Sequence, residues 1–337
     1  MSVRREVSIA LQSDKRPNEY AELARTIEGY GFDVLSIYAD LLYQPPIVPL
    51  TIAAQATTRI RLGPASLNPN TLHPVEIAGQ IATLDLVSNG RAYLGLSRGA
   101  WLDEIGVEQS RPLSRMREAI DVIEHLLTGV TETYEGQHFR LAAHHRLRYA
   151  VQRERVPLLI GSWGERLLSL AGERADEVKI GGSANPDIVP VVSKWIANGA
   201  AVSGREHTGV GICLGAVTVV DEDRDIARSL IRREMAIYLP VVAALDPTVS
   251  IEAELLARMS QLVVSGDAVA AGALIPDDLL DRFSFAGNPA DLIEHSEALF
   301  DAGVTRIEFG TPHGVTAERG LRLLGEQVLP ALLRGYV

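Results

Sequence analysis

The chain has 337 residues, of which 47% are hydrophobic and 22% charged, a composition typical of globular proteins. Its net charge of -11 and the lack of any basic run argue against a nucleic-acid partner, and no apolar run approaches the ~20 residues of a membrane helix. Since Cys213 is the one cysteine, an internal disulfide is excluded, and a buried thiol in a reducing, cytoplasmic setting is expected.

Apolar runs of strand length alternate with amphipathic stretches of helix length. Several of the runs are apolar throughout, which is typical of parallel strands buried on both faces. The first run follows Glu6 directly, so the N-terminus reads as the start of a strand and not as a signal peptide. The eight predicted strands cover residues 7–11, 33–39, 59–67, 91–97, 156–161, 177–182, 209–220 and 305–310.

The stretches between these strands have the pattern of helices. Residues 19–29 and 75–87 carry apolar side chains at the spacing of one helix face. Asn288 followed by Pro289 predicts a helix start, and Gly303 predicts its end. Eight βα units in series predict one domain, a (β/α)₈ TIM barrel spanning the whole chain; a doubly wound open sheet is the alternative.

Two segments interrupt this alternation. Residues 130–155 are polar and rich in His and Arg, and residues 247–282 have a helical, alanine-containing pattern. Both are predicted to be insertions in the loops of the barrel. Because the chemistry of such barrels lies at the carboxyl ends of the strands, a long insertion at that end could form a lid.

Candidate site residues follow the second and third strands. Asp40 comes directly after strand 2, where a carboxylate can bind a cofactor ring; capping of the next helix is the alternative. In strand 3, Pro64 stands among the small residues Gly63, Ala65 and Ser66, which is unfavourable for regular pairing. This pattern predicts a bulge that marks a site, or simply an irregular strand end.

Two further strand ends carry glycine-containing loops. The loop after strand 4 has an arginine that can bind an anion, and the loop after residue 160 leads into a helix whose free N–H groups suit a phosphate. A simple turn and an ordinary helix start are the respective alternatives. The residues of the two loops are Ser97, Arg98, Gly99 and Ala100, and Gly161, Ser162, Trp163 and Gly164.

The histidines do not have the spacing of a metal site, so no metal is predicted. His73, in the loop after strand 3, is placed either to donate to a cofactor or to cap the following helix. Residues 285–288 are interpreted as a helix cap and not as an anion site. A GxSxG elbow and a Rossmann fingerprint are both missing.

Residues 62–74, which read LGPASLNPNTLHP, resemble the third-strand motif of the luciferase-like flavin oxidoreductases. The resemblance is closest to the branch typified by F420-dependent methylenetetrahydromethanopterin reductase. It extends well over residues 6–182 and more loosely over 285–310. Other matching stretches are residues 31–33, 81–85, 88–96, 168–176 and 301–304.

This resemblance implies a bacterial luciferase-like barrel that forms a homodimer or a higher homo-oligomer. It also implies a non-prolyl cis peptide between Ala65 and Ser66, behind the central ring of the deazaflavin, with Asp40 near that ring. The two glycine-containing loops match those that hold the cofactor's side chain and phosphate. The implied cofactor-binding residues are Asp40, Ala65, Ser66, Asn68, Ser97, Arg98, Gly99, Ala100, Gly161, Ser162, Trp163 and Gly164.

The chain departs from the family pattern at several of these positions. It has Ala65-Ser66-Leu67 where the family has Gly-Val-Thr, Leu72 where the family has Arg, and Ala100 where the family has an acidic residue. These departures leave the substrate open, so a strict methanopterin substrate is not assumed.

The resemblance therefore implies hydride transfer between coenzyme F420 and a small organic substrate with a C=C, C=N or C=O bond. Asp40 and His73 are the predicted catalytic residues. One alternative is an FMN-dependent monooxygenase of the same superfamily, and another is a flavin-binding barrel without catalytic activity.

Overall fold

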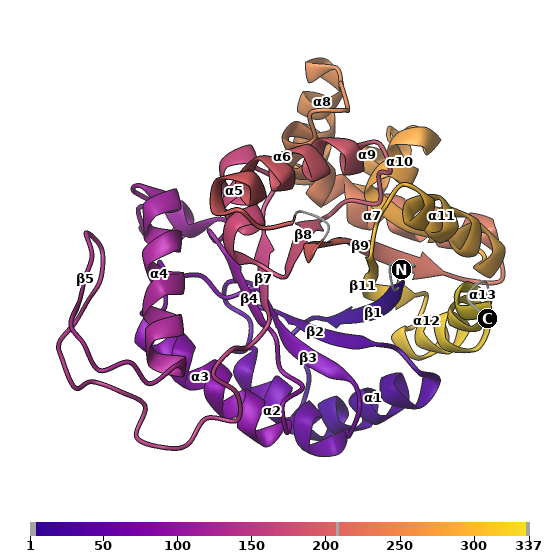
Figure 1. Ribbon diagram of the computed structural model, residues 1–337. Coiled ribbons are helices and arrows are strands. Elements are labelled where there is room, and N and C mark those ends of the chain that lie inside the picture. Colours follow the sequence, from indigo (N-terminus) through magenta and orange to yellow (C-terminus); the bar gives the residue numbers. More distant parts are fainter. Residues whose placement is uncertain (1–4, 207–208, 335–337) are drawn as a thin grey trace.

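Eight parallel strands close into a ring in the computed structural model, which describes residues 5–206 and 209–334 (Figure 1). Seven neighbouring pairs form parallel ladders, and two bridges, Leu62–Ala92 and Leu67–Leu96, join β3 to β4. The predicted TIM barrel is thus confirmed, and the open sheet is excluded. The strands of the ring are β1 (Glu6–Leu11), β2 (Val34–Tyr38), β3 (Arg61–Ala65), β4 (Leu94–Ser97), β7 (Leu158–Gly161), β8 (Glu177–Gly181), β9 (Gly211–Val220) and β11 (Arg306–Gly314).

Helices surround the ring (Figure 1), and local sequence explains where several begin and end. At α3, the side chain of His73 accepts a hydrogen bond from the N–H of Val75, ahead of Pro74. At α11, Asn288 forms the predicted cap in a reciprocal pair with Asp291. These helices are α1 (Pro17–Tyr30), α2 (Ile47–Ala56), α3 (Pro74–Val87), α4 (Pro112–Leu127), α5 (Glu165–Arg174), α6 (Ile188–Ser203), α7 (Arg224–Val242), α11 (Pro289–Asp301), α12 (Ala317–Leu323) and α13 (Leu329–Arg334).

The last strands differ from the prediction in two ways. The strand β8 is shorter than β9 and pairs only with its first half. An additional strand, β10 (Ser284–Gly287), pairs in parallel with the second half of β9. In addition, β11 continues past Gly310, and its pairing with β9 resumes at His313 after an interruption. Residues 1–4, 207–208 and 335–337 of the predicted domain lie outside the described ranges.

The two predicted insertions form separate elements. In residues 130–155 a short hairpin of β5 (Tyr134–Glu135) and β6 (Arg140–Leu141) lies beside α4, at the left of Figure 1. Residues 247–282 form the predicted helical segment, and these helices bury a second hydrophobic cluster against α7. The helices are α8 (Ala253–Val264), α9 (Ala268–Ala273) and α10 (Asp277–Phe283).

The main hydrophobic core lies between the ring and its helices, whereas the interior of the ring contains charged side chains. Arg306, 1% exposed, donates to both carboxylate oxygens of Glu177 at 2.8 and 2.7 Å. Cys213 is fully buried, as predicted, and burial raises the pKa of its thiol. No helix in the described ranges is long and apolar enough to span a membrane.

Candidate active site at the carboxyl ends of the strands

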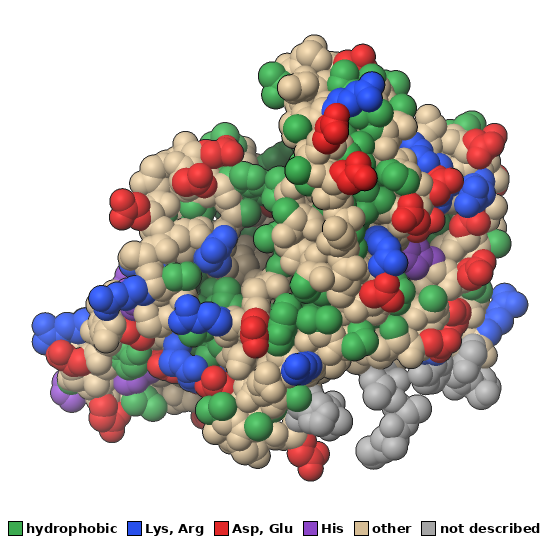
Figure 2. All heavy atoms as spheres, turned by 90° about the horizontal axis from the view of Figure 1, so that it is seen from above, with side chains coloured by type: hydrophobic (Ala, Val, Ile, Leu, Met, Phe, Trp, Pro, Cys, Tyr) green, Lys and Arg blue, Asp and Glu red, His purple; other side chains and the backbone are tan. Residues whose placement is uncertain are grey.

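A cavity of about 2330 Å³ opens at the carboxyl ends of the ring strands. Loops after β2, β3, β4 and β7 contribute to its wall, and α7 contributes residues on another side. On the face seen in Figure 2, acidic and basic side chains are interspersed and hydrophobic side chains gather near the centre. The cavity is therefore the feature of the described chain that is best suited to a small organic ligand.

One wall of the cavity is the bulged end of β3. The peptide bond between Ala65 and Ser66 is cis, as predicted, and both residues line the cavity. The bulge lies close against β4, because a Cβ added at Gly95 would be 2.0 Å from the carbonyl oxygen of Pro64. Glycine at position 95 thus allows the two strands to approach at this point.

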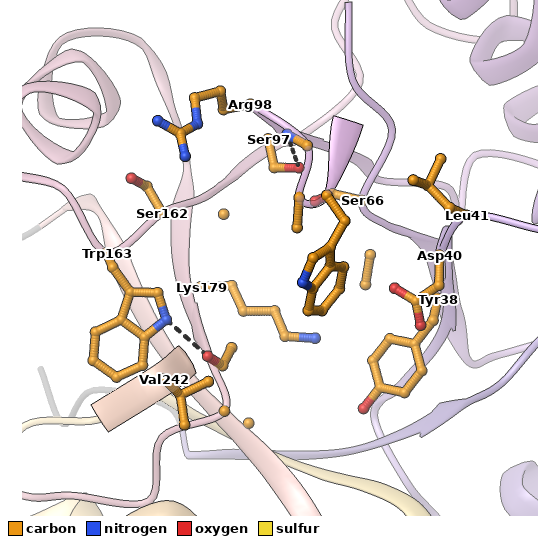
Figure 3. Close-up of a pocket in the computed structure, with 18 of the residues that line it drawn as sticks. Tyr38, Asp40, Leu41, Ser66, Ser97, Arg98, Ser162, Trp163, Lys179 and Val242 are labelled. Carbon is orange, nitrogen blue, oxygen red and sulfur yellow. Dashed lines mark hydrogen bonds between the residues drawn. The ribbon is translucent and has the colours of Figure 1, made fainter. Parts of the chain in front are cut away.

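Asp40 lies on the cavity wall beyond β2 (Figure 3). Its carboxylate accepts a hydrogen bond of 3.0 Å from Nε2 of Gln12, which follows β1. Asp40 does not cap α2, whose N-cap is Pro46, so that alternative is wrong. The side-chain oxygen Oε1 of Gln12 is buried without a partner in the described chain, and Gln12 also lines the cavity.

Hydrogen bonds to its backbone groups stabilise the conformation of the loop after β4. Ser97 Oγ accepts a hydrogen bond from the N–H of Gly99, and Gly99 has a φ of +86°, in the left-handed region. The carbonyl of Arg98 accepts from Asn70 Nδ2 at 2.9 Å. The guanidinium of Arg98 is exposed at the cavity and forms no ion pair with any described residue, so it remains available to an anion.

The loop after β7 leads into α5. Ser162 Oγ accepts from the N–H of Gly164, the N-cap of the helix, and Trp163 Nε1 donates to the carbonyl of Gly181 at 2.9 Å (Figure 3). Arg166, in the first turn, lines the cavity and has no ion-pair partner in the described ranges. The structure therefore brings both predicted loops to one cavity, with an arginine on each side.

Two predicted site residues are not at the cavity. His73 is exposed, caps α3 and contacts the ring of Phe139 edge-on, with centroids 5.3 Å apart. Asn68 is 8% exposed, and its Oδ1 accepts from the N–H groups of Asn70 and Thr71. Neither is among the residues that line the cavity, and both side chains accept hydrogen bonds from local backbone groups, so their predicted role at a cofactor stays a prediction.

Of the two predicted insertions, the first contributes residues to the cavity and the second, in its described residues, does not. The hairpin of residues 130–155 reaches the cavity with Tyr134, Glu135, Gly136 and Gln137. No described residue of 247–282 lines it, so the helical insertion is not a lid over this cavity. The hairpin is held in place by Glu118 of α4, which accepts hydrogen bonds from the N–H groups of Gln137 and His138 at 2.9 and 2.7 Å.

Lys179 of β8 is a cavity residue that sequence reasoning missed. Its side chain points into the ring, pairs with Glu308 of β11 and lies 5.3 Å from the centroid of the Tyr38 ring (Figure 3). Burial alone would raise the pKa of the Glu308 carboxyl, but Lys179 and Arg306 outweigh it and hold that pKa below its usual value. The available signal was a lysine between the apolar residues Val178 and Ile180 of a predicted strand.

A closed parallel barrel with one large cavity at its strand ends defines a (β/α)₈ protein of the kind that binds ligands at that face. The chain belongs to the luciferase-like monooxygenase family, whose model matches residues 2–306. The resemblance found in the sequence is thereby confirmed.

Relatives match over nearly the whole chain. The chain is 32% identical over 323 residues to a 5,10-methylenetetrahydromethanopterin reductase of Archaeoglobus fulgidus, covering 93% of this chain and 94% of the relative. It is 28% identical over 331 residues to an F420-dependent glucose-6-phosphate dehydrogenase of Nakamurella multipartita, with coverages of 94% and 93%. The solved structure of the coenzyme F420-dependent tetrahydromethanopterin reductase from Methanopyrus kandleri matches with a TM-score of 0.89, 28% identity and coverages of 98% and 99%.

Proposed function

We propose that the protein is a coenzyme F420-dependent oxidoreductase that transfers a hydride between the deazaflavin and a small organic substrate. The names of the relatives support this cofactor, since two of those described above are called F420-dependent. The observation that carries the proposal is the cavity of about 2330 Å³ at the strand ends, which is lined by Ala65, Ser66, Asp40 and both glycine-containing loops. Single-ligand pockets measure about 300–1,000 Å³, so this cavity has room for a cofactor and a substrate together.

The residues that line the cavity fit such a cofactor. Ala65 and Ser66, which line the cavity, would form the wall for the flat ring, and the cavity residue Asp40 would supply a polar group near it. When bound, the deazaflavin supplies the hydride chemistry, so the protein's part is to orient two reactants and exclude water.

The anionic side chain of the cofactor fits the two glycine-containing loops. The first N–H groups of α5 have no partner within the helix and attract a phosphate. Arg98 and Arg166 add positive charge on the two sides of this position. Substrates with a C=C, C=N or C=O bond are proposed, and a strict methanopterin substrate is not.

Titration of the purified protein with F420 and, separately, with FMN tests the proposal. Quenching of cofactor fluorescence gives each dissociation constant, and F420 is expected to bind at least about tenfold more tightly, a difference of about 1.4 kcal/mol. Tighter binding of FMN would favour the FMN-dependent monooxygenase. Binding of F420 without turnover by any reductant or oxidisable substrate would favour a flavin-binding barrel without catalytic activity.

We also propose that the protein acts in the cytoplasm as a homodimer. The resemblance to the family supports the dimer, and the single buried thiol of Cys213 is compatible with a reducing compartment. Light scattering coupled to size-exclusion chromatography measures the mass directly, and twice the 36.5 kDa of one chain is the expected result.

A further inference from the structure

Lys179 forms part of the floor of the cavity. It extends from β8 across the interior of the ring toward Tyr38 of β2, and its side chain is only 9% exposed (Figure 3). It lines the same cavity as Ser66 and Asp40. A flat ligand that rests on the β3 bulge and enters the barrel would meet this ammonium group at its innermost edge.

Glu308 fixes the position of the lysine. Its carboxylate is fully buried and accepts hydrogen bonds from Lys179, from Ser36 Oγ and, at 3.3 Å, from Arg306. Arg306 is in turn held by Glu177. The lysine side chain is therefore anchored at the cavity floor by a buried network of ion pairs and hydrogen bonds.

The ammonium group has donors left over. Of its three N–H groups, Glu308 engages one, and no other acceptor lies within hydrogen-bond distance of Nζ among the residues described. Lys179 lines the cavity, so these remaining donors can reach an acceptor placed there. Nothing in the packing of the ring supplies that acceptor, whereas a ligand in the cavity can.

We infer, on the basis of the proposed function, that Lys179 would donate a hydrogen bond to a ring oxygen of a deazaflavin bound in the cavity and would stabilise negative charge there. When a hydride leaves the substrate, two electrons and one hydrogen nucleus are added to the ring system, and the substrate is oxidised. Lys179 keeps its proton throughout and interacts with the charge that spreads onto the ring oxygen. Its interaction is therefore stronger with the reduced cofactor than with the oxidised one.

The test compares the affinities of oxidised and reduced F420 in variants. Lys179→Met removes the ammonium, and the double variant Lys179→Met/Glu308→Gln removes both charges, so that no buried carboxylate loses its partner. Lys194→Met, an exposed lysine on α6, is the matched control. Circular dichroism and thermal unfolding establish which variants are folded.

Both Lys179 variants are expected to lose affinity for reduced F420 about tenfold more than for oxidised F420. For a two-electron couple this lowers the reduction potential of the bound cofactor by about 30 mV. The Lys194 variant should keep the wild-type ratio. If Lys179→Met alone does not fold, the double variant decides the question.

An unchanged ratio of affinities in a folded Lys179 variant would overturn the inference and leave Lys179 as a structural partner of Glu308. A wild-type protein that does not bind F420 would instead overturn the proposed function, and this inference with it. The wild-type titration thus separates the two failures.

Discussion

At the scale of single residues, the shape of the cavity wall depends on the missing side chain of Gly95. An added Cβ would lie 2.0 Å from the backbone oxygen of Pro64, which cannot rotate away. Gly95→Ala is therefore expected to force β3 and β4 apart, to lower the free energy of unfolding by about 2–3 kcal/mol and to weaken cofactor binding.

Urea unfolding of the Gly95 variant measures this loss. Gly29→Ala in α1 is the control, because nothing lies within 4 Å of an added Cβ there. That change should stabilise the protein by up to about 1 kcal/mol, since alanine is the better helix former. Equal stabilities for the two variants would contradict the argument.

Asp40 provides a second prediction at this scale. Asp40→Asn retains the size of the side chain and an oxygen that can accept from Gln12, but it removes the charge at the cavity wall. The rate of hydride transfer in a single turnover is expected to fall about 10- to 100-fold. Stopped-flow absorbance measures that rate, with Asp103→Asn, an exposed carboxylate outside the cavity lining, as the control. An unaltered rate would remove Asp40 from the mechanism.

The residue scale also shows what a sequence pattern cannot resolve. Asp40 and His73 both follow a strand end, yet Asp40 lines the cavity and His73 caps a helix. The two outcomes depend on side-chain direction, which follows from the path of the loop and not from its composition. Lys179 was missed for the opposite reason, because a strand position does not reveal that the interior of the ring is charged.

At the scale of elements, the carboxylate of Glu118 is one of several α4 groups that attach the β5–β6 hairpin; Ser114 and Asp121 of the same helix contact the side chains of His138 and Tyr134. Desolvation acts to raise the pKa of the Glu118 carboxyl, but hydrogen bonds from the backbone of residues 137–139 outweigh it, and the pKa is lowered. Glu118→Gln should weaken these charge-assisted bonds by about 1–2 kcal/mol. The backbone amides of the hairpin should then exchange faster with solvent.

Hydrogen-exchange mass spectrometry of residues 130–145 tests this prediction. Glu124→Gln, on the same helix, removes a carboxylate that pairs with Arg174 instead of the hairpin, and it should leave the exchange unchanged. Because the hairpin lines the cavity, the KM of the Glu118 variant is also expected to rise. Equal protection in both variants would show that Glu118 does not hold the hairpin.

Most elements were predictable because periodicity and length are local properties. The eight ring strands and the helix limits at Asn288 and Gly303 were recognised in this way. The strand β10 was not, because it pairs only with the part of β9 that extends beyond β8. The role of the hairpin was also not predicted, since its contacts with α4, made by both backbone and side-chain groups, join residues about 13 to 24 positions apart in the sequence.

At the scale of the whole molecule, His313 links the last strand of the ring, β11, to the first strand, β1. Its Nε2 lies 3.1 Å from the carbonyl oxygen of Ala10, so β11 is linked to β1. Burial lowers the pKa of His313 from 6.5 to about 4. Between these two values the unfolded chain binds a proton that the folded protein does not, so stability falls as the pH drops from about 6.5 toward 4.

The free energy of unfolding contributed by His313 is expected to fall by about 2 kcal/mol between pH 7 and pH 5. His313→Asn removes this titration, and asparagine tolerates the φ of +74° at this position. Urea unfolding of both proteins at the two pH values isolates the effect from that of other groups. The same pH dependence in both proteins would contradict the assignment.

For this protein, the sequence by itself determined the barrel architecture, the family and the cis bulge of β3, because these depend on local pattern and on a continuous motif. The extent of one domain over residues 1–337 stays a prediction. Only the tertiary structure decided which side chains meet in the cavity, including Gln12, Lys179 and the hairpin, because residues distant in sequence are brought together by closure of the ring. Side-chain direction and burial arise from that closure, and no local pattern encodes them.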